Sequence, residues 1–167
     1  RNDPHWVPPL IHDMKTLLDR NAHPFFAHST AEFYLARRNG RCVGRIAAIL
    51  NNNHNRFRRE KASFFGFYES IDDKAVASAL LDAAAQWGRE RGMTEMRGPT
   101  SYSTNETVGL LVDGFDSDPC ILMPHNPRYY IDLMENSGLE KAMDLVVRKG
   151  CRISGIIPEW LQPCSIF

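Results

Sequence analysis

The side chains with the most reactive chemistry in this sequence, its cysteines and histidines, are scattered along the chain. The four cysteines include no Cys-x-x-Cys pair and the six histidines no pair three or four residues apart, so the pattern predicts no metal site. Cys120 follows Pro119, and no histidine or other activating group stands beside it, which argues against a nucleophilic thiol. The scattered cysteines favour a reduced, cytoplasmic protein over a disulfide framework.

A second chemical candidate is the dense basic run Arg56–Lys61, which contains Phe57. Such a run could bind nucleic-acid phosphates while the aromatic ring stacks on a base. The solvated tip of a hairpin is the favoured interpretation, because the whole chain balances 20 Lys and Arg against 20 Asp and Glu. No apolar run approaches the roughly 18 residues that a membrane span needs. We therefore expect neither a nucleic-acid nor a membrane partner.

The elements that must position any site belong to one domain over residues 1–167, with 43% hydrophobic residues to form its core. Two apolar runs on either side of Asn39 and Gly40 predict a β-hairpin. The asparagine cluster at 51–55 predicts a loop, and the aromatic-rich segment 62–69 predicts a third strand.

The strongest helix is predicted over 72–91, where apolar residues recur at i, i+3, i+4 and i+7. Ser70 is its expected cap, with Asp73 three residues later. No regular element is expected over 99–125, and a loop of that length either covers a binding pocket or is a packed loop with no ligand. The other expected elements are helices at 14–18 and 126–138 and strands at 94–97, 142–148 and 151–158.

In chain order these elements are three strands, a helix, a strand, a long loop, a helix and a strand. An antiparallel meander followed by a helical crossover predicts a mixed sheet in an α/β fold. Motifs along residues 3–148 also resemble the GNAT family of N-acyltransferases, and more narrowly a bacterial branch of it. These motifs are DPHWVPPL at 3–10, HPFF at 23–26, VGRIAA at 43–48, FFGFYE at 64–69, RGP at 97–99, TNE at 104–106, GLLVDGF at 109–115 and NPRYY at 126–130.

The resemblance implies a GNAT-like mixed sheet, the acyl-CoA N-acyltransferase fold, with the hairpin and the aromatic strand as its second to fourth strands. It implies acetyl-CoA or another acyl-CoA as co-substrate and a small-molecule amine as acceptor, and it allows a homodimer. Past residue 148 the likeness fades, so we expect a truncated or altered C-terminus.

By the same resemblance, the start of the 72–91 helix receives the pyrophosphate of acyl-CoA. The sequence departs from the family's Arg/Gln-x-x-Gly-x-Gly/Ala loop, because Asp72 stands at the arginine position and Asp73 follows it. Two carboxylates suit the positive end of a helix dipole but repel a diphosphate. The enzymatic interpretation therefore requires backbone amides there that stay open to an anion. The residues assigned to acyl-CoA are Tyr68, Ser70, Lys74, Ala75, Val76, Ala77 and Asn126.

Acyl transfer to an amine needs a base, and the resemblance assigns that role to Glu69. We expect Glu69 on the same strand face as Phe65 and Phe67, where burial would make the carboxylate a stronger base. The plainer alternative is a solvated carboxylate at a strand end.

The reaction also needs an acid, and here the sequence departs from the family again. Met134 stands where the family commonly has its acid tyrosine, so the resemblance leaves Tyr130, one turn earlier, and Tyr129 beside it. A tyrosine that packs in the core with its hydroxyl at the rim is the plainer alternative.

The resemblance therefore implies acyl-CoA-dependent transfer of an acyl group to an amine by direct attack. The alternative is a catalytically inactive GNAT-fold module that binds a small molecule or a partner. The two differ in whether the helix amides are open.

Overall fold

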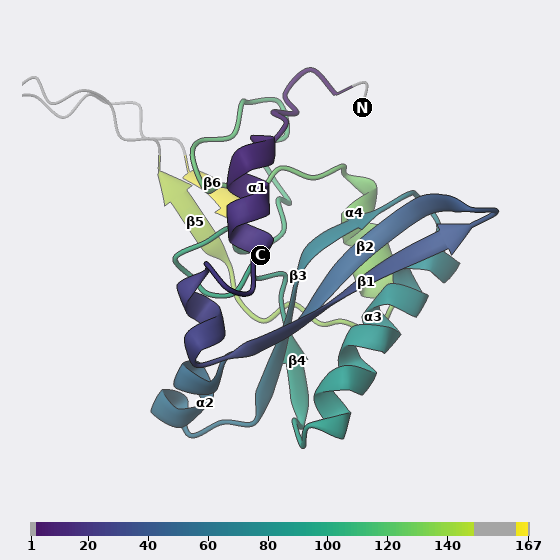
Figure 1. Ribbon diagram of the computed structural model, residues 1–167. Helices are drawn as coiled ribbons and strands as arrows, with labels where there is room; N and C mark the ends of the chain where they lie inside the picture. The colour runs from purple at the N-terminus through teal and green to yellow at the C-terminus, as the bar shows by residue number, and fades with distance from the viewer. Residues whose placement is uncertain (1–2, 149–162, 167) are drawn as a thin grey trace, which may run out of the picture.

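A four-stranded mixed sheet forms the centre of the protein in the computed structural model, which describes residues 3–148 and 163–166 (Figure 1). The strand order is β1-β2-β3-β4; the first two pairings are antiparallel and the third is parallel. This is the predicted meander followed by a helical crossover, so the expected α/β class is confirmed. The strands are β1 (Thr30–Arg38), β2 (Arg41–Leu50), β3 (Ala62–Ser70) and β4 (Glu95–Arg97).

The turn between β1 and β2 is made by Asn39 and Gly40, which both have positive φ, 50° and 77°. Two consecutive residues with positive φ match the twist of a tight hairpin, and Asn-Gly is the pair that adopts them most readily. The predicted hairpin is confirmed.

The crossover helix α3 (Lys74–Glu90) turns one apolar face, including Leu80 and Trp87, into the core. Its cap is Asp73, so the predicted cap at Ser70 is wrong. Ser70 is the last residue of β3, and its hydroxyl donates to the Ile71 carbonyl oxygen at 2.7 Å instead of capping the helix.

The segment predicted as an asparagine-rich loop contains a helix, α2 (Asn52–Arg58). Asn51 caps it by accepting from the His54 amide at 2.9 Å, and Arg59 ends it with φ 58°. The asparagines therefore lie at a helix start, where their side chains bond to backbone amides. The basic run at 56–61 lies on this helix and the turn after it, not at a hairpin tip.

Three further helices and a second sheet complete the described part of the chain. The helices are α1 (Ile11–Leu18), the 3-10 helix η1 (Pro24–Ala27) and α4 (Tyr129–Asn136). The strands β5 (Leu145–Arg148) and β6 (Pro163–Ile166) pair antiparallel. Helix α4 begins three residues later than the predicted start at 126, because the Asn126 side chain bonds to Leu111 and does not cap the helix. The strand expected at 151–158 lies outside the described residues. No helix or strand occurs over 99–125, as predicted.

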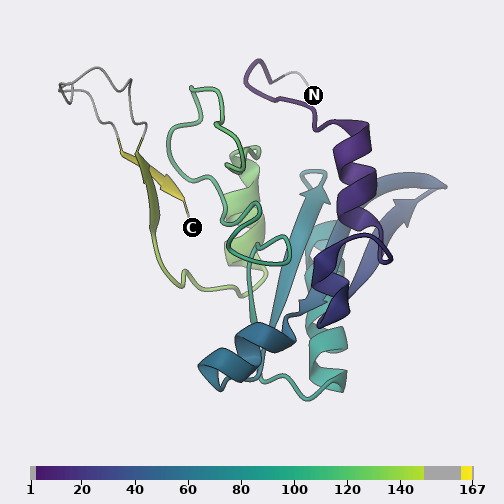
Figure 2. The ribbon, with the colours of Figure 1, turned by 60° about the vertical axis from the view of Figure 1, so that its left-hand side comes forward.

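Two hydrophobic clusters lie on opposite faces of the sheet. The first includes residues of α3 and α4, and the second includes Phe25 of η1 with Leu17 of α1 packed against it; Figure 2 shows these helices around the sheet. Phe65 belongs to the first cluster and Phe67 packs against the second. The prediction that they share a face with Glu69 is wrong, because a β-bulge opposite Arg45 and Ala47 shifts the register and Phe67 has φ 50°.

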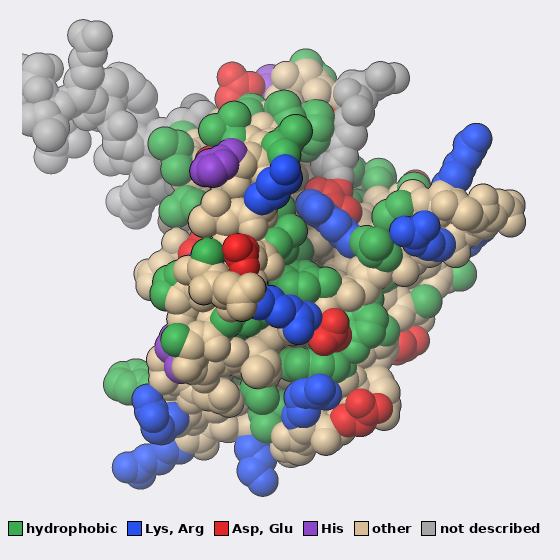
Figure 3. All heavy atoms as spheres, viewed as in Figure 1, with side chains coloured by type: hydrophobic (Ala, Val, Ile, Leu, Met, Phe, Trp, Pro, Cys, Tyr) green, Lys and Arg blue, Asp and Glu red, His purple; other side chains and the backbone are tan. Residues whose placement is uncertain are grey.

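Charged side chains of both signs lie among hydrophobic ones on the face shown in Figure 3. Within 3–148 and 163–166, no helix is both long and apolar enough to cross a membrane, and no group of acidic, histidine or cysteine side chains is arranged to hold a metal ion. Cys42 and Cys120 are free thiols.

Candidate active site

The candidate site lies where β3 and β4 part. The two strands pair only from Ala62 to Phe64 on the β3 side, and the rest of β3 runs on towards its end at Ser70. There α4 contacts it: the Tyr129 hydroxyl donates to the Ser70 carbonyl oxygen at 2.9 Å, and the Ser70 amide donates to the Tyr130 hydroxyl oxygen at 2.9 Å. The two tyrosines thus fix the end of β3 by bonding the carbonyl oxygen and the amide of Ser70.

Glu69 and Tyr130, the predicted base and acid, are brought together at this place. The Tyr130 hydroxyl lies 3.1 Å from Glu69 Oε2, while Arg45 Nη2 lies 3.8 Å from Oε1. Arg45 is the residue opposite Glu69 on β2. The Glu69 carboxylate therefore has a partner at each oxygen. Its side chain is 34% exposed, so it also remains accessible to solvent.

Tyr68 contributes a buried hydroxyl to the same region. It makes no hydrogen bond to a described residue; the Ser70 hydroxyl lies near it but outside hydrogen-bond geometry. Burial raises the pKa of Tyr68, which the neighbouring Ser70 hydroxyl offsets in part. The phenol therefore stays protonated at neutral pH and can donate to an acceptor that reaches it. A buried hydroxyl without a partner is uncommon in folded proteins.

The start of α3 carries an internal anion. Asp73 Oδ1 accepts from the amides of Ala75 and Val76 at 2.9 and 3.2 Å, and Asp73 Oδ2 lies 2.8 Å from Arg38 Nη1. The Arg38 hydrogen bond, with those two amides, lowers the pKa of Asp73 below its usual value. The amide of Ala77 bonds to the Asp73 carbonyl oxygen within the helix. In this conformation the amides of Ala75, Val76 and Ala77 all have partners within the chain.

The remaining side chains at this helix start do not favour a diphosphate either. The Lys74 ammonium donates to Asn136 Oδ1 on α4 at 3.2 Å, and the exposed Asp72 adds a second carboxylate. A diphosphate needs open amides and a net positive field. The start of α3, as it stands, does not fit one.

Asn126, assigned to acyl-CoA by resemblance, is buried and bonded to the loop. Its Oδ1 accepts from the Leu111 amide at 2.7 Å and its Nδ2 donates to the Leu111 carbonyl oxygen at 3.1 Å. The side chain therefore pairs with Leu111 as a strand neighbour would, and fixes the long loop beside α4.

The first part of the 99–125 loop is packed into the fold. Tyr102 is 2% exposed, its ring stacks on Phe25 at 4.5 Å, and its hydroxyl donates to the Leu17 carbonyl oxygen at 3.0 Å. Its φ of 70° is unusual for a residue other than glycine. Of the two open alternatives, a packed loop describes this part of the segment.

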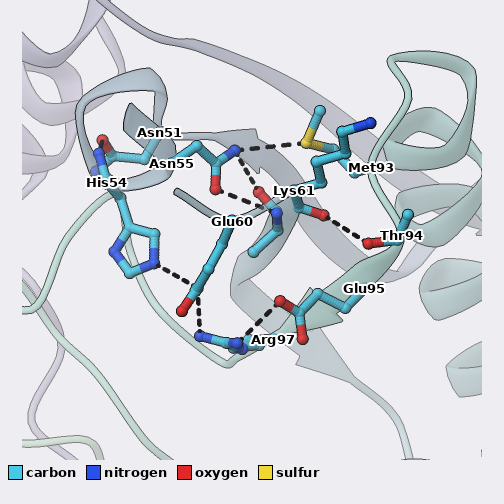
Figure 4. A network of polar contacts seen from close by, with 10 residues as sticks. Asn51, His54, Asn55, Glu60, Lys61, Met93, Thr94, Glu95 and Arg97 are labelled. Carbon is cyan, nitrogen blue, oxygen red and sulfur yellow. Dashed lines mark hydrogen bonds and ion pairs between the residues drawn. The ribbon is translucent and has the colours of Figure 1, made fainter. Parts of the chain in front are cut away.

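A second polar network joins α2 to the sheet at the start of β3 and at β4 (Figure 4). Glu60 Oε2 lies 2.9 Å from Arg97 Nη1 and 3.3 Å from His54 Nε2, and Arg97 also bonds Glu95. Burial raises the pKa of Glu60, but the hydrogen bonds and charges of His54 and Arg97 outweigh it and lower the pKa below its usual value. Because Arg97 faces the carboxylates of both Glu60 and Glu95, the network ties α2 to β4.

Sequence reasoning missed Arg45, Arg38 and the capping role of Asp73. Arg45 lies inside the VGRIAA motif, but its position opposite Glu69 depends on the register across the bulge, which no local pattern reveals. Asp73 carries a signal that could have been used: an aspartate directly before a periodic apolar run is a preferred cap.

Known proteins resemble this chain over nearly all of its length. The model of the acetyltransferase (GNAT) family matches residues 4–108. A bacterial ceramide synthase from Caulobacter vibrioides is 40% identical over 161 residues, which are 96% of this chain and 42% of that protein. Protein YghO from Escherichia coli is 35% identical over 150 residues, 87% of this chain and 37% of that protein.

The chain spans about two fifths of the length of these curated relatives. No solved structure matches it. The family match covers well over half of the residues, and it includes β1 to β4 and the crossover helix. The chain therefore belongs to the acetyltransferase (GNAT) family.

Proposed function

We propose that this chain carries the catalytic groups of an N-acyltransferase that moves an acyl group from a thioester to an amine, with Glu69 as the base. The supporting observation is the Glu69 carboxylate itself, which is held by Tyr130 and Arg45, stays partly exposed, and lies where β3 and β4 part. Members of the family use acyl-CoA as co-substrate.

The chemistry assigned to these residues is direct attack. The amine nitrogen bonds to the thioester carbonyl carbon, the carbon–sulfur bond breaks, and the thiolate leaves. Glu69 takes the proton that the nitrogen loses, and Tyr130 holds the carboxylate oriented for it. The buried Tyr68 hydroxyl is proposed to donate a hydrogen bond to the donor, because it has a proton to donate and no described hydrogen-bond partner.

The acceptor class that we propose is a long-chain amino alcohol. The relative from Caulobacter vibrioides is named a ceramide synthase, and a ceramide is the N-acyl derivative of such an amine. This chain spans only 42% of that relative, so the acceptor of the whole protein is part of the proposal.

The test follows thiol release when the protein is mixed with an acyl-CoA and a panel of amines that includes a long-chain amino alcohol. We expect Glu69→Gln to lower the rate about 100-fold, within the range that a general base supplies. Glu135→Gln, an equal change at an exposed position on α4, is the matched control and keeps the wild-type rate. Equal rates for Glu69→Gln and wild type would remove Glu69 as the base.

A second candidate is a GNAT-fold module that binds a small molecule or a partner without transferring an acyl group. The observation in its favour is the Asp73 carboxylate on the α3 amides. It predicts no thiol release with any amine, together with thermal stabilisation by a ligand that is not a thioester.

A further inference from the structure

The Asp73 carboxylate binds the amides at the start of α3, where the family resemblance places the pyrophosphate of acyl-CoA. Asp73 accepts from the amides of Ala75 and Val76 in the first turn of the helix and pairs with the Arg38 guanidinium. The Asp73 side chain is 26% exposed and Arg38 51% exposed, so the carboxylate lies between the amides and the solvent-exposed guanidinium. The positive end of α3 and the Arg38 guanidinium could together attract an anion, but the Asp73 carboxylate of the same chain already neutralises both.

We infer that this chain recognises its acyl donor through the acyl group and the pantetheine arm, and makes no diphosphate contact at the start of α3. The inference rests on the proposed function and deepens it. The ligand class is an acyl thioester on a pantetheine arm, supplied either by CoA or by an acyl carrier protein.

Charge around the helix start favours this reading over simple displacement of Asp73. A diphosphate that displaced the Asp73 carboxylate would still meet the negative charges of Asp73 and of its neighbour in the sequence, the exposed Asp72. Lys74, the basic residue of the first turn, is bonded to Asn136 on α4. Groups able to meet the uncharged part of a donor remain: the buried Tyr68 hydroxyl has no described partner, and Glu69 is accessible.

Equilibrium binding by calorimetry tests the inference without requiring turnover. The probes are acetyl-CoA, S-acetyl-pantetheine and an acetylated acyl carrier protein, each repeated with the octanoyl thioester. For the wild-type chain we expect the CoA and pantetheine thioesters to bind within roughly threefold of each other. An acyl carrier protein that binds more tightly than acyl-CoA identifies the carrier as the source of the arm; the reverse order, still within that threefold, identifies CoA.

The variant Asp73→Gly removes the internal anion while a glycine keeps most of the capping preference. We expect it to raise the affinity for acyl-CoA by about tenfold or more and to leave the affinity for acyl-pantetheine unchanged. Asp82→Asn, which removes one charge from the exposed side of the same helix, is the control and changes neither affinity.

A wild-type chain that binds acyl-CoA about tenfold or more tightly than acyl-pantetheine overturns the inference. If the wild type binds no thioester, the proposed function fails, and Asp73→Gly alone decides the inference: gained acyl-CoA binding supports a closed phosphate site, and continued absence of binding overturns it.

Discussion

At the end of β3, the two oxygens of Glu69 face different partners, and the partner on β2 is open to test. Arg45 Nη2 lies 3.8 Å from Oε1, and a guanidinium beside a carboxylate favours the ionised form. We therefore expect Arg45→Gln to move the acidic limb of the kcat/KM–pH profile to higher pH. Transfer at low pH falls while the plateau at high pH changes little, because only the fraction of Glu69 that is ionised at low pH depends on the guanidinium.

Arg41→Gln, at the exposed start of the same strand, is the control for this change and keeps the wild-type profile. Rates that fall equally at every pH would mean that Arg45 only supports the fold. A carboxylate resonance of Glu69 followed by NMR through the same pH range reports the same shift in a variant with no measurable turnover.

At this scale, resemblance predicted the two residues that meet, Glu69 and Tyr130, but not what surrounds them. A carboxylate's second partner depends on the register between strands, and a bulge of one residue alters that register. The sequence FFGFYE is typical of a regular strand whose side chains alternate between the two faces, and it does not indicate that Phe67 has positive φ. The prediction that Glu69 shares a face with both Phe65 and Phe67 is therefore wrong, and its role as a base stays a prediction.

At the scale of the element, α3 shows how a cap links local stability to pH. The pKa of Asp73 is lowered in the folded protein, first by the hydrogen bond from Arg38 and then by the amides of α3. A lowered native pKa means that Asp73 contributes stability above the unfolded value of about 3.9, and that this contribution is lost as pH falls through the lower native value.

We therefore expect the wild type to exceed Asp73→Asn in unfolding free energy at pH 6, with the difference shrinking towards pH 3. Urea unfolding at both pH values measures it. Asp82→Asn, on the same helix, is the comparison whose difference from wild type stays nearly constant. A difference for Asp73→Asn that is constant with pH would contradict the cap and ion-pair account.

Elements whose sequence signals lie within the element itself were predicted, and those whose signals are ambiguous or depend on distant contacts were missed or misplaced. The hairpin depends on two adjacent residues and α3 on an apolar period, and both were found. Helix α2 was missed because asparagines are typical of loops, whereas Asn51 here bonds to the first turn of a helix. The start of α4 was misplaced because the Asn126 side chain bonds to Leu111, fifteen residues earlier, and so does not cap the helix.

On the scale of the whole molecule, the long loop contacts the sheet where the backbones of Thr100 and Gly66 approach closely. The Thr100 amide donates to the Phe65 carbonyl oxygen at 2.7 Å, directly beside Gly66. A Cβ on Gly66 would collide with the carbonyl group of Thr100, and the nearest atoms are backbone atoms that cannot rotate away. Glycine is needed there for space, which the sequence alone did not reveal.

Gly66→Ala is therefore expected to loosen the loop from the sheet. Tyr102, which fills the second hydrophobic cluster and anchors to Asn51 and Leu17, would shift with it, and the cluster would lose part of its packing. We expect a loss of about 1–3 kcal/mol in unfolding free energy, typical of an overpacked site, and faster amide exchange over 100–109. Gly138→Asn is the control, because its positive φ suits asparagine and no atom lies within 4 Å of the added Cβ. Exchange over 100–109 that matches the wild type in Gly66→Ala would show that the loop is held by its other contacts instead.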